Sequence, residues 1–272
     1  MPQPALPNAR VQGGTRVFAI VGDPIAQTRS PLVFNELFLR HDVDAVLVPL
    51  HVPAADLDTV MRGLMRIPNL GGFVVTVPHK IRLVEFVDEV LPIAARVGAI
   101  NCMARAADGR WRGEIYDGEA FVAGLRKFGR DPRGGKVFQA GAGGAGRAVA
   151  HALAAAGVAR LDLADVAVER AAELLADLSR LYPDTVFRFA HDAPADSDMV
   201  VNATPCGMAA ADPLPFALDP LGPHALVADL IMKPEQTALL QLAEARGLAT
   251  HLGRHLLDCQ AEIIARFWGA LP

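Results

Sequence analysis

The sequence lacks any excess of basic residues, since 26 Lys and Arg stand against 30 Asp and Glu and give a formal net charge of −4 at pH 7. This balance offers no electrostatic basis for binding nucleic acid or a membrane surface. The chain also lacks an apolar run near the ~18 residues that a membrane-spanning helix needs. We therefore expect neither nucleic acid nor a membrane among its partners.

Cysteine is scarce as well. Cys102, Cys206 and Cys259 are odd in number and far apart, which favours free thiols in a reducing cytosol and a cytoplasmic protein. Residues 1–14 are rich in Pro, Asn and Gly and have no basic segment followed by an apolar one. They predict a frayed tail and no signal peptide.

Metal ligands are sparse too. His251 and His255 stand four positions apart, but Gly253 lies between them and no Glu completes a zinc-protease motif. A junction between a loop and a helix explains the pair better, and we expect no metal site.

The chain does contain a glycine turn between a strand pattern and a helix pattern. The turn follows the apolar run 136–140, precedes the alanine-rich run 147–156, and consists of Gly141, Ala142, Gly143, Gly144, Ala145 and Gly146. This is the dinucleotide-binding pattern G-x-G-x-x-G in its strand–turn–helix setting. The first glycine allows the tight turn, the second lets the backbone approach a pyrophosphate, and the third lets helix and strand pack closely. The phosphates would lie at the helix N-terminus.

Asp165 ends the next predicted strand, 160–164, and lies 19 positions after Gly146. An acid there hydrogen-bonds the adenosine ribose, and Val166 and Ala167 supply no cation for a 2′-phosphate. A unit charge ~4 Å from the carboxylate is repelled by roughly 4 kcal/mol, which predicts NAD over NADP by at least ~100-fold. Alternatively, Asp165 caps the helix that starts near Ala167, and the two roles can coexist. Arg170, one turn into that helix, leaves some use of NADP open.

Alternating apolar runs and helical patterns predict an α/β fold with mostly parallel sheets. We expect two domains: a substrate domain from residues 1–117 and 253–272, and an inserted Rossmann nucleotide-binding domain over 118–252. The first domain has predicted strands at 17–21, 45–50 and 72–77, and predicted helices at 31–39 with Ser30 as N-cap, at 54–65 and from 80 to 86. The second has predicted strands at 136–140, 160–164, 186–189, 199–203 and 225–231, and predicted helices at 118–128, 147–156, 168–181 and 235–246. A last helix is predicted at 256–268.

Four segments of the first domain carry polar side chains of the kinds that bind ligands and transfer protons. They offer the hydroxyls of Thr28 and Ser30 at a helix start, Thr76 and Lys80 at a strand end, the carboxamide of Asn101, and the carboxylate of Asp117. Hydroxyls near a helix N-terminus suit a carboxylate, and a lysine can take or return an alcohol proton. Taken singly, each also has a bland interpretation, such as a solvated lysine or an aspartate N-cap.

Together with segments 202–208 and 253–260, these motifs resemble the shikimate/quinate dehydrogenase family from about residue 17 to residue 269. The resemblance implies reversible reduction of a cyclic 3-ketone to its alcohol with a nicotinamide cofactor. It implies Lys80 and Asp117 as the catalytic pair. It implies substrate contacts at Thr28, Ser30, Thr76, Asn101 and Gln260. It adds Asn202, Thr204, Met208 and Gly253 to the glycine turn and Asp165 as cofactor-binding residues.

Several positions depart from the family pattern. Val74 and Ile115 replace asparagines, Tyr116 replaces a threonine, and Met232 stands where a tyrosine is usual. The usual Asn-Arg-Thr clamp for NADP reads Asp-Val-Ala at 165–167. These changes favour a divergent paralogue, a monomer or homodimer, that uses NAD on shikimate, quinate or a related cyclic hydroxy acid such as an aminoshikimate. A non-catalytic protein that binds the ligand or NAD is the alternative.

Overall fold

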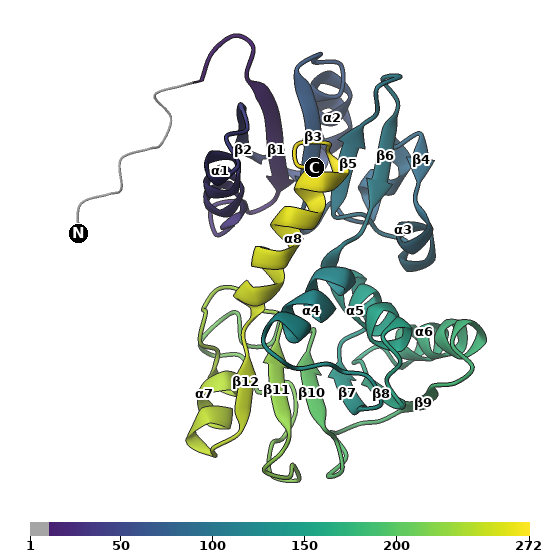
Figure 1. Cartoon of the computed structure of the whole chain (residues 1–272). Coiled ribbons are helices and arrows are strands. Elements are labelled where there is room, and N and C mark those ends of the chain that lie inside the picture. The colour runs from purple at the N-terminus through teal and green to yellow at the C-terminus, as the bar shows by residue number, and fades with distance from the viewer. Residues whose placement is uncertain (1–10) are drawn as a thin grey trace. The chain divides into compact units, whose positions relative to one another are not determined.

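Two β-sheets organise the chain, and each belongs to one of the two units into which the chain divides (Figure 1). The computed structural model describes residues 11–272, so residues 1–10 of the predicted N-terminal tail lie outside the described part. Unit 1 comprises the chain up to Tyr116 together with Ala261–Pro272, and unit 2 comprises Asp117–Gln260. Among the helices of residues 11–272, none is both long and apolar enough to pass through a bilayer.

The sheet of unit 1 mixes parallel and antiparallel strands. Its order is β2 (Ala45–His51), β1 (Arg16–Gly22), β3 (Leu70–Val75), β5 (Cys102–Arg105), β6 (Trp111–Glu114) and β4 (Glu89–Val90). The pairs β1–β2, β1–β3 and β4–β6 are parallel, whereas β5 runs antiparallel to β3 and β6. Its helical segments are α1 (Ser30–Arg40), η1 (Ala54–Asp56), α2 (Leu57–Leu64), η2 (Arg82–Phe86) and α3 (Pro92–Val97).

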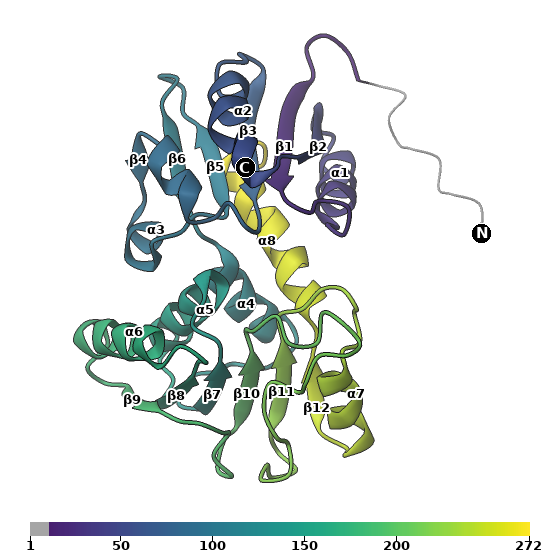
Figure 2. The same ribbon diagram turned by 180° about the vertical axis from the view of Figure 1, so that it is seen from behind.

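One face of this sheet is covered by α1 and by the end of α8 (Gly253–Phe267), whereas α2 lies on the opposite face (Figure 2). The indole of Trp268 stacks on Phe18 with ring centroids 4.2 Å apart, and its Nε1 donates to Met103 O at 2.9 Å. A Cβ at Gly72 would overlap this indole. The C-terminal segment is therefore held by both packing and a buried hydrogen bond.

The sheet of unit 2 is parallel throughout its described strands. Its order is β12 (Ala249–His251), β11 (Leu226–Asp229), β10 (Met199–Asn202), β7 (Lys136–Ala140), β8 (Arg160–Ala164) and β9 (Val186–Phe189). Counted from β7, this is the doubly wound order of a Rossmann fold, with the switch point between β7 and β10. The predicted α/β fold class with a Rossmann domain is confirmed. The helices are α4 (Asp117–Lys127), α5 (Gly144–Ala155), α6 (Val168–Leu181) and α7 (Ala238–Ala245).

Most predicted elements end within a few residues of the observed ones, but some expectations are wrong. Ser30 is the first residue of α1 and not its N-cap, since Arg29 holds that position and no side chain caps the helix. The helix predicted from residue 80 is the 3₁₀ segment Arg82–Phe86. The hairpin of β5 and β6 was missed because its strands are short. The turn residues Asp108 and Gly109, the latter with φ of +84°, were the available signal.

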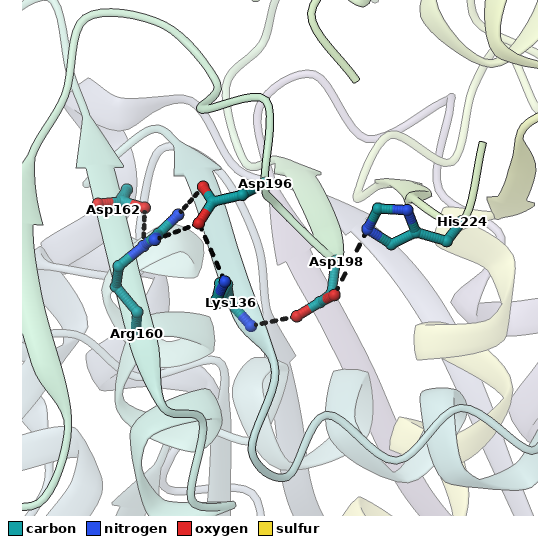
Figure 3. A network of polar contacts seen from close by, with 6 residues as sticks. All are labelled: Lys136, Arg160, Asp162, Asp196, Asp198 and His224. Atoms are coloured by element: carbon teal, nitrogen blue, oxygen red, sulfur yellow. Dashed lines mark hydrogen bonds and ion pairs between the residues drawn. The ribbon is translucent and has the colours of Figure 1, made fainter. Parts of the chain in front are cut away.

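A network of charged side chains joins the amino ends of the strands in unit 2 (Figure 3). Arg160 contacts Asp162 at 2.6 Å and both carboxylate oxygens of Asp196, which also accepts from Lys136 Nζ at 3.0 Å. These bonds hold the pKa of Asp196 well below its usual value, with Arg160 as the largest cause. Asp162 is only 2% exposed, so its charge depends on the guanidinium.

Replacing Arg160 by Met should lower the free energy of unfolding by about 3 kcal/mol, because it leaves the buried Asp162 carboxylate without its partner. Urea denaturation at neutral pH measures this change. The matched control is Arg180→Met, which removes an exposed pair with Asp177 and should alter stability by less than about 0.5 kcal/mol. Equal effects of the two substitutions would contradict the assignment.

Candidate functional site

The glycine turn of unit 2 brings backbone against backbone at the switch point. Gly141 has φ of +102°, and a Cβ there would lie 2.6 Å from Ala203 O. A Cβ at Gly146 would overlap Gly141 O, so neither position accepts a side chain. At Gly143, the N-cap of α5, a Cβ would meet no heavy atom within 4 Å. The turn thus leaves open space beside a helix N-terminus, the geometry that suits a phosphate.

Asp165 ties this turn to the start of α6. Its Oδ2 accepts from Ala142 N at 2.7 Å, and its Oδ1 accepts from Ala167 N at 2.8 Å. The N-cap of α6 is Ala167, with no side-chain cap, so Asp165 stabilises the preceding turn. Arg170 Nη1 lies 3.9 Å from Oδ2 and is half exposed. Arg170 therefore places a positive charge beside the carboxylate, although the next two residues in the sequence, Val166 and Ala167, carry none.

The side chain of Asn202 is fully engaged within the loop that follows β10. Its Oδ1 accepts from Thr204 N at 3.0 Å and Thr204 Oγ1 at 2.7 Å. Its Nδ2 donates to Cys206 O at 3.0 Å and Asp229 Oδ1 at 3.1 Å. These four bonds use the whole hydrogen-bonding capacity of the amide, so Asn202 shapes the loop and has no group left for a ligand. Met208 lies further along the same loop and is 54% exposed.

Gly253 begins α8 in close contact with the end of β11. A Cβ there would lie 2.5 Å from Ile231 O and 2.7 Å from Leu230 O. The predicted loop-to-helix junction contains a buried pair, with His251 Nδ1 and His255 Nδ1 3.3 Å apart. Burial lowers the pKa of His251 to about 4, with the charge of His255 as the next cause.

In unit 1 the loop after β1 carries Thr28, and Ser30 begins α1 directly after it. Thr28 Oγ1 donates to Ile25 O at 2.9 Å, and Ser30 is only 6% exposed. The single proton of the Thr28 hydroxyl is thus directed at a carbonyl. Binding a carboxylate through it would require rotation of this hydroxyl.

Thr76, Lys80 and Asn101 come together at the carboxyl end of β3. Thr76 N donates to Val21 O at 3.0 Å, next to the end of β1. Val75 N donates to Asn101 O at 2.7 Å, and Ile100 N donates to Lys80 O at 2.8 Å. Asn101 is 1% exposed, and its Oδ1 accepts from Tyr116 N at 3.0 Å. The bond from Tyr116 N holds this buried amide next to the end of β3.

Two buried side chains that the sequence analysis did not single out hold this edge in place. His79 Nε2 bonds to Val52 O at 2.7 Å and so fixes the residue before Lys80. Glu114 Oε1 accepts from Ala94 N at 2.6 Å and Ile115 N at 2.9 Å. In the sequence, the signal for His79 was its position next to Lys80, the predicted catalytic residue. The signal for Glu114 was weaker, because the strand that it ends was itself missed.

Asp117 opens unit 2 as the first residue of α4 and is 6% exposed. Its Oδ1 accepts from Gln260 Nε2 at 2.8 Å, so the predicted catalytic carboxylate is directly bonded to a predicted substrate contact. A Cβ at Gly118 would overlap Ala148 O, because α4 packs directly on the backbone of α5. This close packing fixes the helix end that carries Asp117.

The departures from the family pattern fall partly in the core. Val74 and Ile115 are buried, and Tyr116 packs edge-on against Phe267 with ring centroids 5.5 Å apart. The Tyr116 ring therefore fills space in unit 1.

Comparisons with known proteins agree on one family. A model of the shikimate dehydrogenase substrate binding domain matches residues 20–103. A shikimate dehydrogenase (NADP(+)) from Rubrobacter xylanophilus is 38% identical over 263 residues, covering 95% of this chain and 92% of that protein. The structure of Listeria monocytogenes shikimate 5-dehydrogenase with shikimate and NAD is 28% identical, covers 96% of this chain and 94% of that one, and has a TM-score of 0.86. Corynebacterium glutamicum quinate dehydrogenase with NAD is 28% identical, covers 94% of each chain, and has a TM-score of 0.84.

The buried histidine pair predicts a pH-dependent stability. The pKa of His251 is about 4 in the folded chain against an ordinary 6.5, so the unfolded chain binds protons first as the pH falls. Acidification from pH 6.5 to 4 should therefore lower the free energy of unfolding by up to about 3 kcal/mol. His251→Phe should reduce this loss, as measured by thermal unfolding at each pH. The exposed control His41→Gln should leave it unchanged, and identical pH profiles for all three proteins would refute the assignment.

Proposed function

Because this chain belongs to the shikimate dehydrogenase family, we propose that it interconverts a cyclic polyhydroxy acid such as shikimate or quinate and its 3-dehydro ketone, using a nicotinamide dinucleotide. The observation that carries the proposal is the cluster of Thr76, Lys80 and Asn101 at the carboxyl end of β3, in a chain that also holds a glycine turn at a Rossmann switch point.

The residues present fit a dinucleotide. The open space at Gly143 and the N-terminus of α5 suit the pyrophosphate, and Asp165 can still accept from a ribose hydroxyl, since each carboxylate oxygen has two lone pairs. Val166 beside it is fully exposed and apolar, a surface that adenosine would cover. When bound, the nicotinamide supplies hydride exchange with the substrate carbon.

The protein's share of the chemistry is proton transfer and orientation. Lys80 takes the hydroxyl proton during oxidation and returns it to the alkoxide during reduction. Asp117 holds the ammonium and the substrate hydroxyl in line, and Gln260 keeps its carboxylate oriented through the 2.8 Å bond. Asn101 and Thr76 bind substrate oxygens, while Ser30 and a rotated Thr28 bind the carboxylate.

A dehydrogenase of another cyclic hydroxy acid, such as an aminoshikimate, is the second candidate. It is favoured by the changes at Val74, Ile115 and Met232, which alter the surroundings of the site while Lys80 and Asp117 are kept. Turnover of such an acid without turnover of shikimate or quinate would select it. A non-catalytic paralogue would bind the cofactor and turn over no member of the panel.

Lys80→Met should lower kcat by about 10²–10⁴-fold for whichever acid the wild type oxidises, because the proton acceptor is gone. The assay is formation of reduced nicotinamide with shikimate and quinate separately. Cofactor affinity should stay within about threefold of the wild-type value, and the exposed control Lys127→Met should retain full turnover. Unchanged turnover of Lys80→Met would remove the catalytic assignment.

For the cofactor we propose NAD as the preferred dinucleotide, on the negative charge of Asp165. The Rubrobacter relative carries NADP(+) in its name, which favours the other cofactor, and Arg170 is the cation that would then meet a 2′-phosphate. Because Arg170 offsets part of the carboxylate charge, we expect the preference for NAD to be nearer tenfold than the ~100-fold expected without it.

The charges of Asp165 and Arg170 should have opposite effects on the preference between NAD and NADP. Asp165→Ser should raise kcat/KM for NADP relative to NAD by about tenfold, whereas Arg170→Met should lower it. Both ratios come from initial rates with each cofactor at fixed substrate. A ratio that neither substitution moves would show that specificity lies elsewhere.

A further inference from the structure

Asp229 is the last residue of β11, and the sequence analysis assigned it no role. It is 1% exposed. Its Oδ1 accepts from Asn202 Nδ2 at 3.1 Å and Ile231 N at 2.9 Å, and its Oδ2 accepts from Thr237 Oγ1 at 2.7 Å. These bonds join three segments of unit 2: the loop after β10, the end of β11 and the start of α7. Burying a charged group is costly, so a carboxylate here needs a compensating role.

Asp229 bonds to the nitrogen end of the Asn202 amide. An ionised carboxylate only accepts hydrogen bonds, so the amide nitrogen of Asn202 must face it. The amide oxygen then faces Thr204, where it accepts from the backbone N–H and the hydroxyl. With the amide turned the other way, its oxygen would face the carboxylate oxygen of Asp229, and its NH2 group would face the backbone N–H of Thr204. Three partners of the amide require this same orientation, which closes the turn over residues 202–206: Thr204 N donates to its oxygen, whereas Cys206 O and Asp229 Oδ1 accept from its nitrogen.

This turn lies directly against the glycine turn. Ala203 N donates to Ala140 O at 2.8 Å, and a Cβ at Gly141 would lie 2.6 Å from Ala203 O and 3.0 Å from Thr204 N. A Cβ at Gly146 would lie 3.3 Å from Ala203 Cβ. The two turns are in direct contact. A displacement of residues 203–204 would therefore move the backbone of the glycine turn beside the open space that suits a phosphate.

We propose that Asp229 is a positioning residue for the dinucleotide: through Asn202 it holds the loop of residues 203–208 against the glycine turn and so sets cofactor affinity. The inference rests on the proposed function only in taking a nicotinamide dinucleotide as the ligand of this turn. Asp229 itself touches no reacting atom; it acts through the amide of Asn202.

The test is cofactor affinity, measured by calorimetry with NAD and with NADP in the absence of substrate. Asp229→Ala should weaken binding of the preferred cofactor by at least about tenfold, because Asn202 Nδ2 loses one of its two acceptors and the three segments joined by the carboxylate are released. Asp229→Asn should bind within about threefold of the wild type. Its Oδ1 can still accept from Asn202 and Ile231, and its Nδ2 can donate to the Thr237 hydroxyl.

Asp162→Ala is the matched control, since Asp162 is 2% exposed on β8 of the same sheet and belongs to the network in Figure 3. It should lower the melting temperature without weakening cofactor binding. This separates positioning from a general loss of stability.

A second variant keeps the test decisive if Asp229→Ala does not fold. Asn202→Asp preserves the acceptor toward Thr204 but sets two carboxylates against each other, and it should weaken cofactor binding by at least about tenfold. Adding Asp229→Asn restores a donor between the two positions and should recover part of the affinity, a coupling that independent sites would not show.

Wild-type affinity in folded Asp229→Ala or in Asn202→Asp would overturn the inference, as would a wild-type protein that binds neither dinucleotide. A wild-type protein that binds a dinucleotide but oxidises no cyclic acid would overturn the proposed reaction and leave this inference supported by the measured affinities. The two failures are therefore distinguishable.

Discussion

The contact on which the nucleotide unit depends is the approach of two backbone segments at its switch point. Gly141 and Gly146 allow the glycine turn to fold on itself and to lie against Ala203, where any Cβ would collide with a carbonyl. In a parallel sheet, ligand-binding loops gather at the carboxyl ends of the strands. Close packing of two such loops makes this edge of the sheet rigid. A pyrophosphate needs that rigidity, because the groups that bind it are backbone N–H groups.

Loops of this kind lack the repeating hydrogen bonds of helices and sheets, so buried side chains have to supply them. Asp165 accepts from Ala142 N, Asn202 from Thr204 N, and Glu114 from Ala94 N and Ile115 N. In each case a side-chain oxygen stabilises a turn next to a residue with an assigned role. The cost of burying these polar groups is offset only when every donor and acceptor is used, and the four bonds of Asn202 meet that condition.

The fold class could be predicted from the sequence because its signals are local. The glycine turn sits between an apolar strand and an alanine-rich helix, and the central strands of unit 2 contain short apolar runs at 199–201 and 226–228, as in buried parallel sheets. The β5–β6 hairpin was missed because its four-residue strands carry too little periodic signal to separate them from a loop. The cation beside Asp165 was underestimated for a different reason. The predicted helix 168–181 matches α6 and places Arg170 one turn from Asp165, but the direction of its long side chain depends on a rotamer that the sequence does not determine.

A resemblance to a family names residues without distinguishing those that touch a ligand from those that hold others in place. The count of hydrogen bonds makes that distinction physically. Asn202 and Gln260 are both buried amides from the expected set. Asn202 uses all its capacity on the loop that follows it and on Asp229, whereas Gln260 donates to Asp117, the carboxylate that we propose to be catalytic. A buried amide that is saturated by its own loop can affect binding only through shape. Its partner Asp229 then matters because this buried acceptor ties the amide, and with it the turn, to the end of β11.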